Sequence, residues 1–422
     1  MAACVVDMAA CVVGYDRERR EIAVPFGRAP AGESEDRKEE TEPAIVVVTG
    51  DSTTSICAEL EKIRAAAPLA FAIVRSDVVS GSARGRLDCY ASGARMLAND
   101  DAAVDAGIGR AMAQWDSSFT EGEERYKCPT CGMDGLSEDA LHLHYPLYHT
   151  TEMTPPCDCP ICGRKAGEYR AFAIHLHNEH GPVGDREPQF PDFNAFSWVV
   201  CRRPQDGKLL LVHEPAAIAG GQPNFWFPAG RVDEGETFVE AGKRETEEEG
   251  GVSVDIKGVL LFKLGGGVVP RIVLYAEPRG LRGDGGGVDG GVDGGGVDGK
   301  DDAGGAAQGG GGGDDRACDT AKSIPDFESC GAGWVDVSEL DALDDTSDYR
   351  SRGTADLLRS VASGVLEPLP IDTPSFRGLE EMVVRLTSSD GEGGDIGRWL
   401  EEIGSVWGKL AEEYPADRLQ HE

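Results

Sequence analysis

The stretch GRVDEGETFVEAGKRETEEEGGV, residues 230–252, decides the fold of the chain around it. A turn that contains glycine leads into a segment with helical spacing, which predicts a helix. In that helix Glu245, Glu248 and Glu249 are three and four residues apart, so their carboxylates share one face. Three acids in one turn repel one another, whereas hard cations such as Mg²⁺ use such oxygens as ligands and leave positions for water and phosphate.

Arg244 and Glu236 extend this pattern. The arginine lies in the same turn as the three acids, and its pairing with Glu236 would fix the loop before the helix. The sequence therefore predicts a Mg²⁺ (or Mn²⁺) site at which a metal-bound water attacks a phosphorus of a diphosphate. The alternative is an ordinary solvated helix rich in glutamate.

Residues 230–252 resemble the Nudix box over its full length, with Thr246 as the one departure, where the family favours an aliphatic residue. The resemblance implies a Nudix α/β/α sandwich that hydrolyses nucleoside diphosphates linked to another moiety. It implies metal ligation by Glu248 and Glu249, and a role as ligand or general base for Glu245. The implied catalytic set is Glu245, Glu248, Glu249, Arg244, Glu236 and Gly230, the last through its carbonyl oxygen.

Two further site candidates lie outside the box. Glu328 resembles the acidic position before a late strand that bears a tryptophan, where some Nudix members carry another ligand or base. Trp226 could stack on a nucleobase, although an aromatic residue on a strand more often belongs to the core. The segment PAGR at 228–231 resembles Nudix enzymes that degrade oxidised guanine nucleoside diphosphates, but other substrate motifs are absent, so the substrate stays open.

Two sets of cysteine and histidine share one spacing and resemble tandem zinc fingers of the Cys/His type. Two thiolates on a hairpin and two imidazoles about one helical turn apart suit tetrahedral zinc, so we predict two structural Zn²⁺ ions. The predicted ligands are Cys128, Cys131, His144 and His149 in one finger, and Cys159, Cys162, His175 and His180 in the other. Cys157 is an alternative to Cys159. His142 and His177 are predicted to be solvated neighbours rather than ligands.

The fingers lack the side chains that read DNA. Their base-reading positions would be Ser137, Ala140 and Leu143 in one finger and Glu168, Ala171 and Ile174 in the other. None of these is the Arg, Asn or Gln that recognises a base edge. Residues 121–180 also carry five basic and ten acidic side chains. We therefore expect a protein partner for the fingers and no sequence-specific DNA binding.

The fold class expected is multidomain α/β, with a Nudix sandwich, tandem ββα fingers and a small parallel α/β unit at the N-terminal side. The predicted divisions are a disordered tail (1–42), the small α/β unit of unknown role (43–118), the fingers (119–183), the Nudix domain (193–345) and a C-terminal helical segment (346–422). Within the Nudix domain, 17 of the 32 residues at 283–314 are glycine, which predicts a disordered insertion.

The composition of the chain argues against several classes of protein. The 422 residues carry 41 basic and 75 acidic side chains, a formal charge of −34, which disfavours a protein that coats nucleic acid. No apolar run reaches the length of a membrane helix, so we expect no membrane partner. Five of the twelve cysteines fall within residues 128–162, which indicates metal binding in a reducing compartment, the cytoplasm or the nucleus.

The leading interpretation is a Mg²⁺-dependent Nudix pyrophosphohydrolase acting on a nucleotide derivative, with the fingers as a docking module. The alternative is a zinc-finger adaptor whose Nudix domain binds a ligand without turnover. A binding-only domain has no chemical need for three aligned carboxylates, which favours the enzyme. Hydrolysis of RNA caps is a third interpretation, and the net acidity of the chain disfavours it.

Overall fold

The structure is a computed structural model that describes residues 23–25, 44–67, 70–113, 124–151, 153, 156–166, 169–181, 194–219, 221, 223–265, 269–279, 319–344, 347–387 and 396–421. The predicted insertion at 283–314 and most of the predicted tail at 1–42 lie outside these residues. Within the described part, no helix combines the length and apolarity needed to cross a membrane.

The N-terminal unit is a four-stranded sheet with helices on it. Its strands run in the order β1 (Ala23–Pro25), β2 (Ala44–Val48), β3 (Phe71–Val74) and β4 (Met96–Leu97). Strands β2, β3 and β4 are parallel, which confirms the small parallel sheet, and β1 pairs antiparallel with β2 from within the predicted tail. The helices are α1 (Thr53–Ala66), α2 (Asp77–Ser80), α3 (Ala83–Ser92) and α4 (Asp101–Ala113).

The finger region follows, with helices α5 (Glu138–His149) and α6 (Tyr169–His180). The second finger has the short hairpin β5 (Cys157–Asp158) and β6 (Lys165–Ala166), whereas the first has a single bridge between Tyr126 and Leu136. Helix α5 is buried among residues of the N-terminal unit, since Tyr145 and Tyr148 share one apolar cluster with Phe71. The first finger therefore packs on the N-terminal unit.

The central domain holds two sheets. The five-stranded sheet has the order β10 (Ala229–Arg231), β7 (Phe196–Cys201), β12 (Val269–Pro278), β11 (Val254–Gly265) and β14 (Leu419–His421). The three-stranded sheet has the order β13 (Ala332–Val335), β8 (Leu209–Glu214) and β9 (Asn224–Trp226). Helix α8 (Phe238–Gly250) contacts strands of both sheets, and the short helix α7 (Ala216–Ala219) follows β8.

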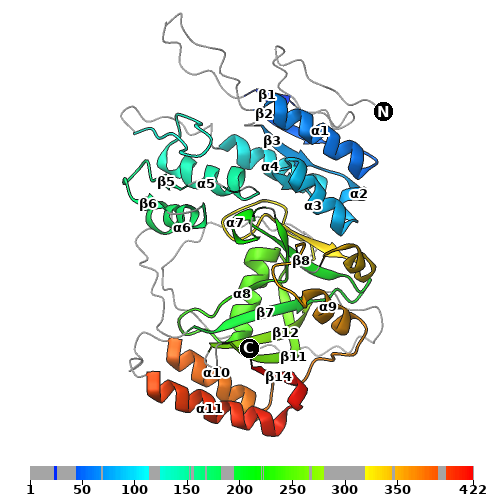
Figure 1. The fold of residues 1–422 in the computed structure, drawn as a ribbon, viewed down its shortest axis with the longest axis vertical. Helices are drawn as coiled ribbons and strands as arrows, with labels where there is room; N and C mark the ends of the chain where they lie inside the picture. Colours follow the sequence, from blue (N-terminus) through cyan, green and yellow to red (C-terminus); the bar gives the residue numbers. More distant parts are fainter. Residues whose placement is uncertain are drawn as a thin grey trace, which may run out of the picture.

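The segment after residue 345 belongs to the same core. The remaining helical elements are η1 (Val337–Ala342), α9 (Thr354–Ala362), α10 (Pro374–Thr387), α11 (Ile396–Glu413) and η2 (Ala416–Arg418). Phe376, Trp407 and Leu410 join the apolar cluster that also contains Phe238 of α8. Strand β14 pairs in parallel with β11 and lies at the edge of its sheet (Figure 1). A division at 345/346 would therefore cut through one packed core.

Polar contacts tie the N-terminal unit to the central domain, which lies below it in Figure 1. Arg86 is 2% exposed and donates to the carbonyl of Ala332 at 3.4 Å and to Asn99 Oδ1 at 2.5 Å. Asn99 itself donates to the same carbonyl at 3.2 Å, and Tyr90 donates to the carbonyl of Cys330 at 3.1 Å. The start of β13 and the loop before it are therefore held from the N-terminal side.

Candidate active site

Helix α8 begins and ends at strong local signals. The hydroxyl of Thr237 accepts from the backbone N–H of Glu240, while the Glu240 carboxylate accepts from Thr237 N–H, and this reciprocal pair forms a capping box. Gly251 ends the helix at φ 74°, a left-handed conformation that favours glycine. Glu380 of α10 accepts from the first free N–H groups, those of Phe238 and Val239. The helix that carries the acids is thus fixed at both ends.

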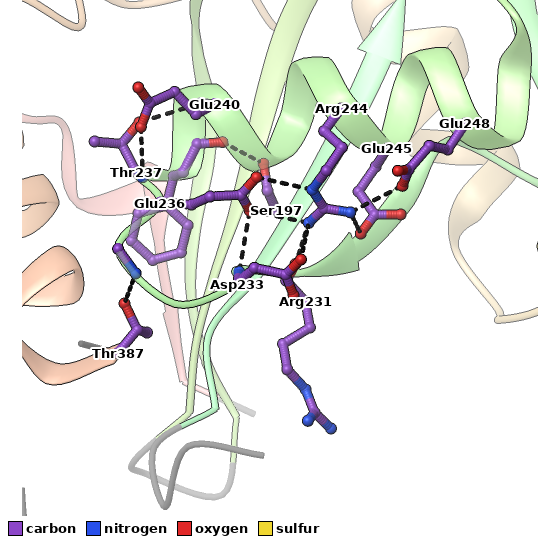
Figure 2. Close-up of polar contacts among 12 residues, drawn as sticks. Ser197, Arg231, Asp233, Glu236, Thr237, Glu240, Arg244, Glu245, Glu248 and Thr387 are labelled. Atoms are coloured by element: carbon purple, nitrogen blue, oxygen red, sulfur yellow. Dashed lines mark hydrogen bonds and ion pairs between the residues drawn. The ribbon is translucent and has the colours of Figure 1, made fainter. Parts of the chain in front are cut away.

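Arg244 is the centre of the site, as Figure 2 shows. Its guanidinium donates twice to Glu236, at 2.8 and 3.0 Å, which is the pairing expected from the sequence. A further nitrogen, Nη1, donates to Glu245 at 2.8 Å and to Glu248 at 2.9 Å. Nη2 also reaches the carbonyl of Arg231 at 2.8 Å. One arginine therefore fixes the preceding loop and two of the three aligned acids.

Gly230 and Glu249 complete the junction between β10 and α8. A Cβ atom at Gly230 would overlap the carboxylate of Glu245, so glycine is needed here for that carboxylate to keep its observed place. The Glu249 carboxylate accepts from the backbone N–H of Ala229 at 2.8 Å. Thr246, the departure from the box pattern, is fully buried and its hydroxyl donates to the Gly242 carbonyl at 2.6 Å. Threonine is therefore accommodated inside the helix.

Glu245 and Glu249 are buried in a negatively charged environment, whereas Glu248 is exposed. Burial raises the pKa of Glu245 to about 7, with Glu248 adding to the shift against the pull of Arg244. Burial also raises the pKa of Glu249, followed by the repulsion of Glu214 and Glu245. Acids crowded in this way fit a divalent cation, because its charge would offset both the burial and the repulsion.

Glu328 lies close enough to these acids to be affected by their charges. Burial raises its pKa to about 8, and Glu245, Asp326 and Glu248 add to the shift. We call residues 322–330 the Glu328 loop. Two of its side chains donate to carbonyl oxygens of α8: Lys322 Nζ to Glu248 at 2.6 Å and Ser329 Oγ to Glu249 at 2.9 Å. The loop is therefore anchored to the catalytic helix.

Trp226 is a core residue in this structure, which agrees with the interpretation that the sequence favoured and not with stacking on a nucleobase. The side chain is 4% exposed, and its ring stacks on Phe227 with centroids 4.1 Å apart. Trp198 contacts it edge-on, and the Arg350 guanidinium lies 5.6 Å from its centroid. A base would need an accessible ring face, and these neighbours cover the ring.

Glu214 and Arg350 are site neighbours that the sequence reasoning missed. Glu214 ends strand β8, is 2% exposed and pairs with Arg350 at 3.0 Å. It also contributes to the raised pKa of Glu249. An acid directly after the apolar run LLLVH was a signal, since buried carboxylates need a partner. The partner lies 136 residues further along the chain, which no local pattern reveals.

The two Cys/His sets each gather four donor atoms within 4.8 Å of one another. The distances from Sγ to Nε2 are 3.4 Å for Cys128–His149, 3.4 Å for Cys131–His144, 3.6 Å for Cys159–His180 and 3.3 Å for Cys162–His175. Tetrahedral zinc with ordinary bond lengths separates such atoms by about 3.5 Å. Both predicted sets therefore fit zinc, with Cys159 and not Cys157 in the second set.

The two fingers contact each other through His180, one of the predicted zinc ligands of the second finger. His180 Nδ1 lies 2.8 Å from the Glu138 carboxylate of the first finger, while Nε2 faces the cysteines of its own set. A carboxylate on the second ring nitrogen orients a histidine toward its metal. His142 and His177 are half-buried rather than solvated, because their rings stack on each other with centroids 5.8 Å apart. The fingers therefore pack as a pair.

Comparison with known proteins finds one family model that matches part of the chain. The family model of the NUDIX domain matches residues 194–270, which include β7, α8 and all of β11. This chain carries a NUDIX domain. The curated relative "Putative nudix hydrolase 1" of Caenorhabditis elegans is 25% identical over 183 residues, or 40% of this chain and 39% of that protein. The chain thus spans about two fifths of that relative's length.

Solved structures similar to the NUDIX domain include a NUDIX hydrolase from Nitrosomonas europaea, with 19% identity, a TM-score of 0.26, and coverage of 43% of this chain and 96% of that one. An ADP-ribose pyrophosphatase from Streptococcus suis has 15% identity, a TM-score of 0.25, and coverage of 41% and 92%. TM-scores this low say nothing about the activity of the chain. The residues of the site are the basis for its proposed function.

Proposed function

We propose that the chain is a Mg²⁺-dependent Nudix pyrophosphohydrolase that cleaves a diphosphate bond in a nucleoside diphosphate derivative. The observation that supports it most directly is the arrangement around Arg244, which holds Glu245 and Glu248 on one face of α8 within the NUDIX domain. A protein that only bound a ligand would have no use for acids kept crowded at a cost in repulsion.

In this proposal Glu248 and Glu249 hold Mg²⁺, with Glu245 as a third ligand or as the base. The ion would polarise the phosphoryl oxygens and lower the pKa of a bound water. Arg244 keeps Glu245 and Glu248 oriented, and Gly230 leaves the space that the Glu245 carboxylate occupies. Glu328 stands off the helix, beside Glu245 and Glu248, where a further ligand or a proton acceptor would lie.

The zinc sites are proposed as structural. Helix α5 is covered by the N-terminal unit, and its Ser137 hydroxyl caps the helix by accepting from Ala140 N–H at 3.1 Å. Two of the three base-reading positions of that finger are therefore used inside the chain: Ser137 caps the helix, and Ala140 is buried, at 3% exposure. This supports fingers that bind protein rather than DNA, with this chain's own domains among their contacts.

The test is hydrolysis of a panel of nucleoside di- and triphosphates, oxidised guanine nucleotides, ADP-ribose and dinucleotides in the presence of Mg²⁺. The doubly substituted Glu248→Gln, Glu249→Gln protein should lose turnover by several orders of magnitude. Glu247→Gln is the matched control, because Glu247 lies on the same helix and is exposed. Wild-type protein that is folded, holds two zinc ions and is silent on every compound would favour the adaptor interpretation.

A further inference from the structure

The second finger reaches the Glu328 loop through one aromatic contact. The ring of His177 on α6 stacks on the ring of Phe327, with centroids 3.8 Å apart and planes 25° from parallel. Phe327 is the direct neighbour of Glu328. The finger therefore contacts the loop next to the residue that faces the acids of α8.

The Glu328 loop contains a tight turn, in which hydrogen bonds fix Glu328 relative to Phe327. Asp326 Oδ1 accepts from the backbone N–H groups of Glu328 at 3.0 Å and Ser329 at 3.2 Å. The backbone N–H of Asp326 also donates to the carbonyl of Ser329 at 3.0 Å. With Phe327 fixed on one side of such a turn, Glu328 has little freedom on the other.

The position of His177 depends in turn on the zinc set. His177 lies on α6 between His175 and His180, the two imidazoles of the second set. Fingers of this kind fold with their metal, so a zinc ion in this set would fix the helix and the direction of the His177 ring. Cys330, at the other end of the loop, donates through Sγ to the carbonyl of Thr150, directly after α5.

We propose that the second finger acts within its own chain as a positioning element for the active site: His177, through its stack on Phe327, holds Glu328 beside the acids of α8. This proposal rests on the hydrolase function proposed above. His177 and Phe327 are positioning residues, since neither reaches the acids of α8 except through Glu328. The finger thereby contributes to catalysis at a distance.

The experiment compares kcat and KM of the zinc-loaded full chain with those of four variants and of Glu328→Ala, which is the background of the fourth. His177→Ala removes the stack, and we expect kcat to fall about 3- to 10-fold with KM changed less than about 2-fold. His177→Phe restores an aromatic ring and should return kcat to within about 2-fold of wild type. Glu179→Ala is the control, because Glu179 lies on the same helix and pairs with the exposed Arg164.

The fourth variant decides whether His177 acts through Glu328. In a Glu328→Ala background, adding His177→Ala should lower kcat no further, since the residue to be positioned is gone. An equal loss in both backgrounds would overturn the proposal. So would a normal kcat in His177→Ala. Wild-type protein without turnover on any substrate would instead contradict the hydrolase function itself.

A readout independent of turnover completes the test. Hydrogen exchange of residues 322–330 should become faster in His177→Ala and stay at the wild-type rate in Glu179→Ala, with zinc content unchanged in both. Equal protection of this peptide in all variants would also overturn the proposal, because it would show that the stack does not hold the loop.

Discussion

Gly230 shows how one atom can decide the geometry of the site. A methyl group at this position would occupy the space of the Glu245 carboxylate. We therefore expect Gly230→Ala to displace Glu245 from Arg244 and to lower kcat at least about 100-fold, since small misplacements at a reacting centre have effects of this size.

The fold should survive that substitution, because Glu245 can rotate away. Circular dichroism and the melting temperature would verify this. Gly378→Ala is the control, since Gly378 lies in helix α10 with no atom near its added Cβ, and alanine there should leave the activity intact. A fully active Gly230→Ala protein would contradict the assigned place of Glu245.

His213 gives the chain a sensitivity to acid. The side chain is fully buried on β8, and burial lowers its pKa well below 6.5, with Arg86 adding to the shift. Its other neighbours are Tyr90, Phe225 and the Gly331 carbonyl. Below pH 6.5 the unfolded chain takes up a proton that the folded chain does not, so this contribution is complete above pH 6.5 and is lost as the pH falls.

The corresponding prediction uses His213→Phe. Between pH 7.5 and 5.5 the wild type should lose about 1.4 kcal/mol more of its free energy of unfolding than the variant does. Urea unfolding at both pH values measures the difference, and protonation of the zinc ligands affects both proteins alike. Identical losses in the two proteins would show that His213 does not titrate in this way.

At the scale of elements, local sequence signals predicted helix α8 and the two Cys/His sets, but they did not predict the pairing of strands that are distant in sequence. The spacing of the acids predicted α8, and the turn and capping residues around it agree with the helix observed. The same reasoning found both Cys/His sets, because each is encoded within a short stretch. It did not find β11, whose long apolar strand has two register shifts, or β14, whose partner is remote in sequence. Such pairing depends on tertiary packing rather than on local pattern.

Prediction of the site had the same limits. The acids and the arginine of α8 could be proposed from the sequence because the helix sets their spacing. Glu214 and Arg350 were missed because they come from separate elements, and for Trp226 the sequence left stacking on a ligand open beside the core position that the structure shows. An aromatic residue on a strand has the same sequence signal in either role, so burial alone distinguishes them.

Helix α11 tests whether the C-terminal part belongs to the NUDIX core. Leu410 is 0% exposed and packs in the cluster around α8, whereas Leu400 on the same helix is 43% exposed. We expect Leu410→Ala to lower the free energy of unfolding by about 2–4 kcal/mol and Leu400→Ala by less than about 1 kcal/mol. Urea denaturation would measure both. Equal small losses would indicate that α11 contributes nothing to the core.

At the scale of the whole molecule, the N-terminal unit and the NUDIX domain share buried polar contacts. Arg86, Tyr90 and Asn99 on one side bond to backbone groups of residues 321–332 on the other. Separation would break these bonds and expose their groups to water, and each such bond contributes about 0.5–1.5 kcal/mol to stability. The units are therefore expected to unfold together.

Two probes on one thermal scan check this cooperativity. Zinc release, followed with a coloured chelator, reports the fingers, and tryptophan fluorescence reports the central domain with its C-terminal helices, because five of the six tryptophans lie within residues 198–407. Both transitions should have the same midpoint within about 2 °C. Zinc release well below the fluorescence midpoint would show that the fingers melt independently of the domain on which they pack.

The pairing of β14 with β11 has a consequence for the nascent chain during translation. Arg418 donates to the carbonyl of Leu260, a separation of 158 residues, and β14 then covers the edge of β11. At ordinary rates of translation, on the order of 10–30 s pass between the synthesis of the two strands. During that interval the ribosome presents an apolar strand with an unpaired edge, a template for association with other chains. Chaperone binding to the nascent polypeptide should therefore be concentrated on β11 and end once β14 has emerged.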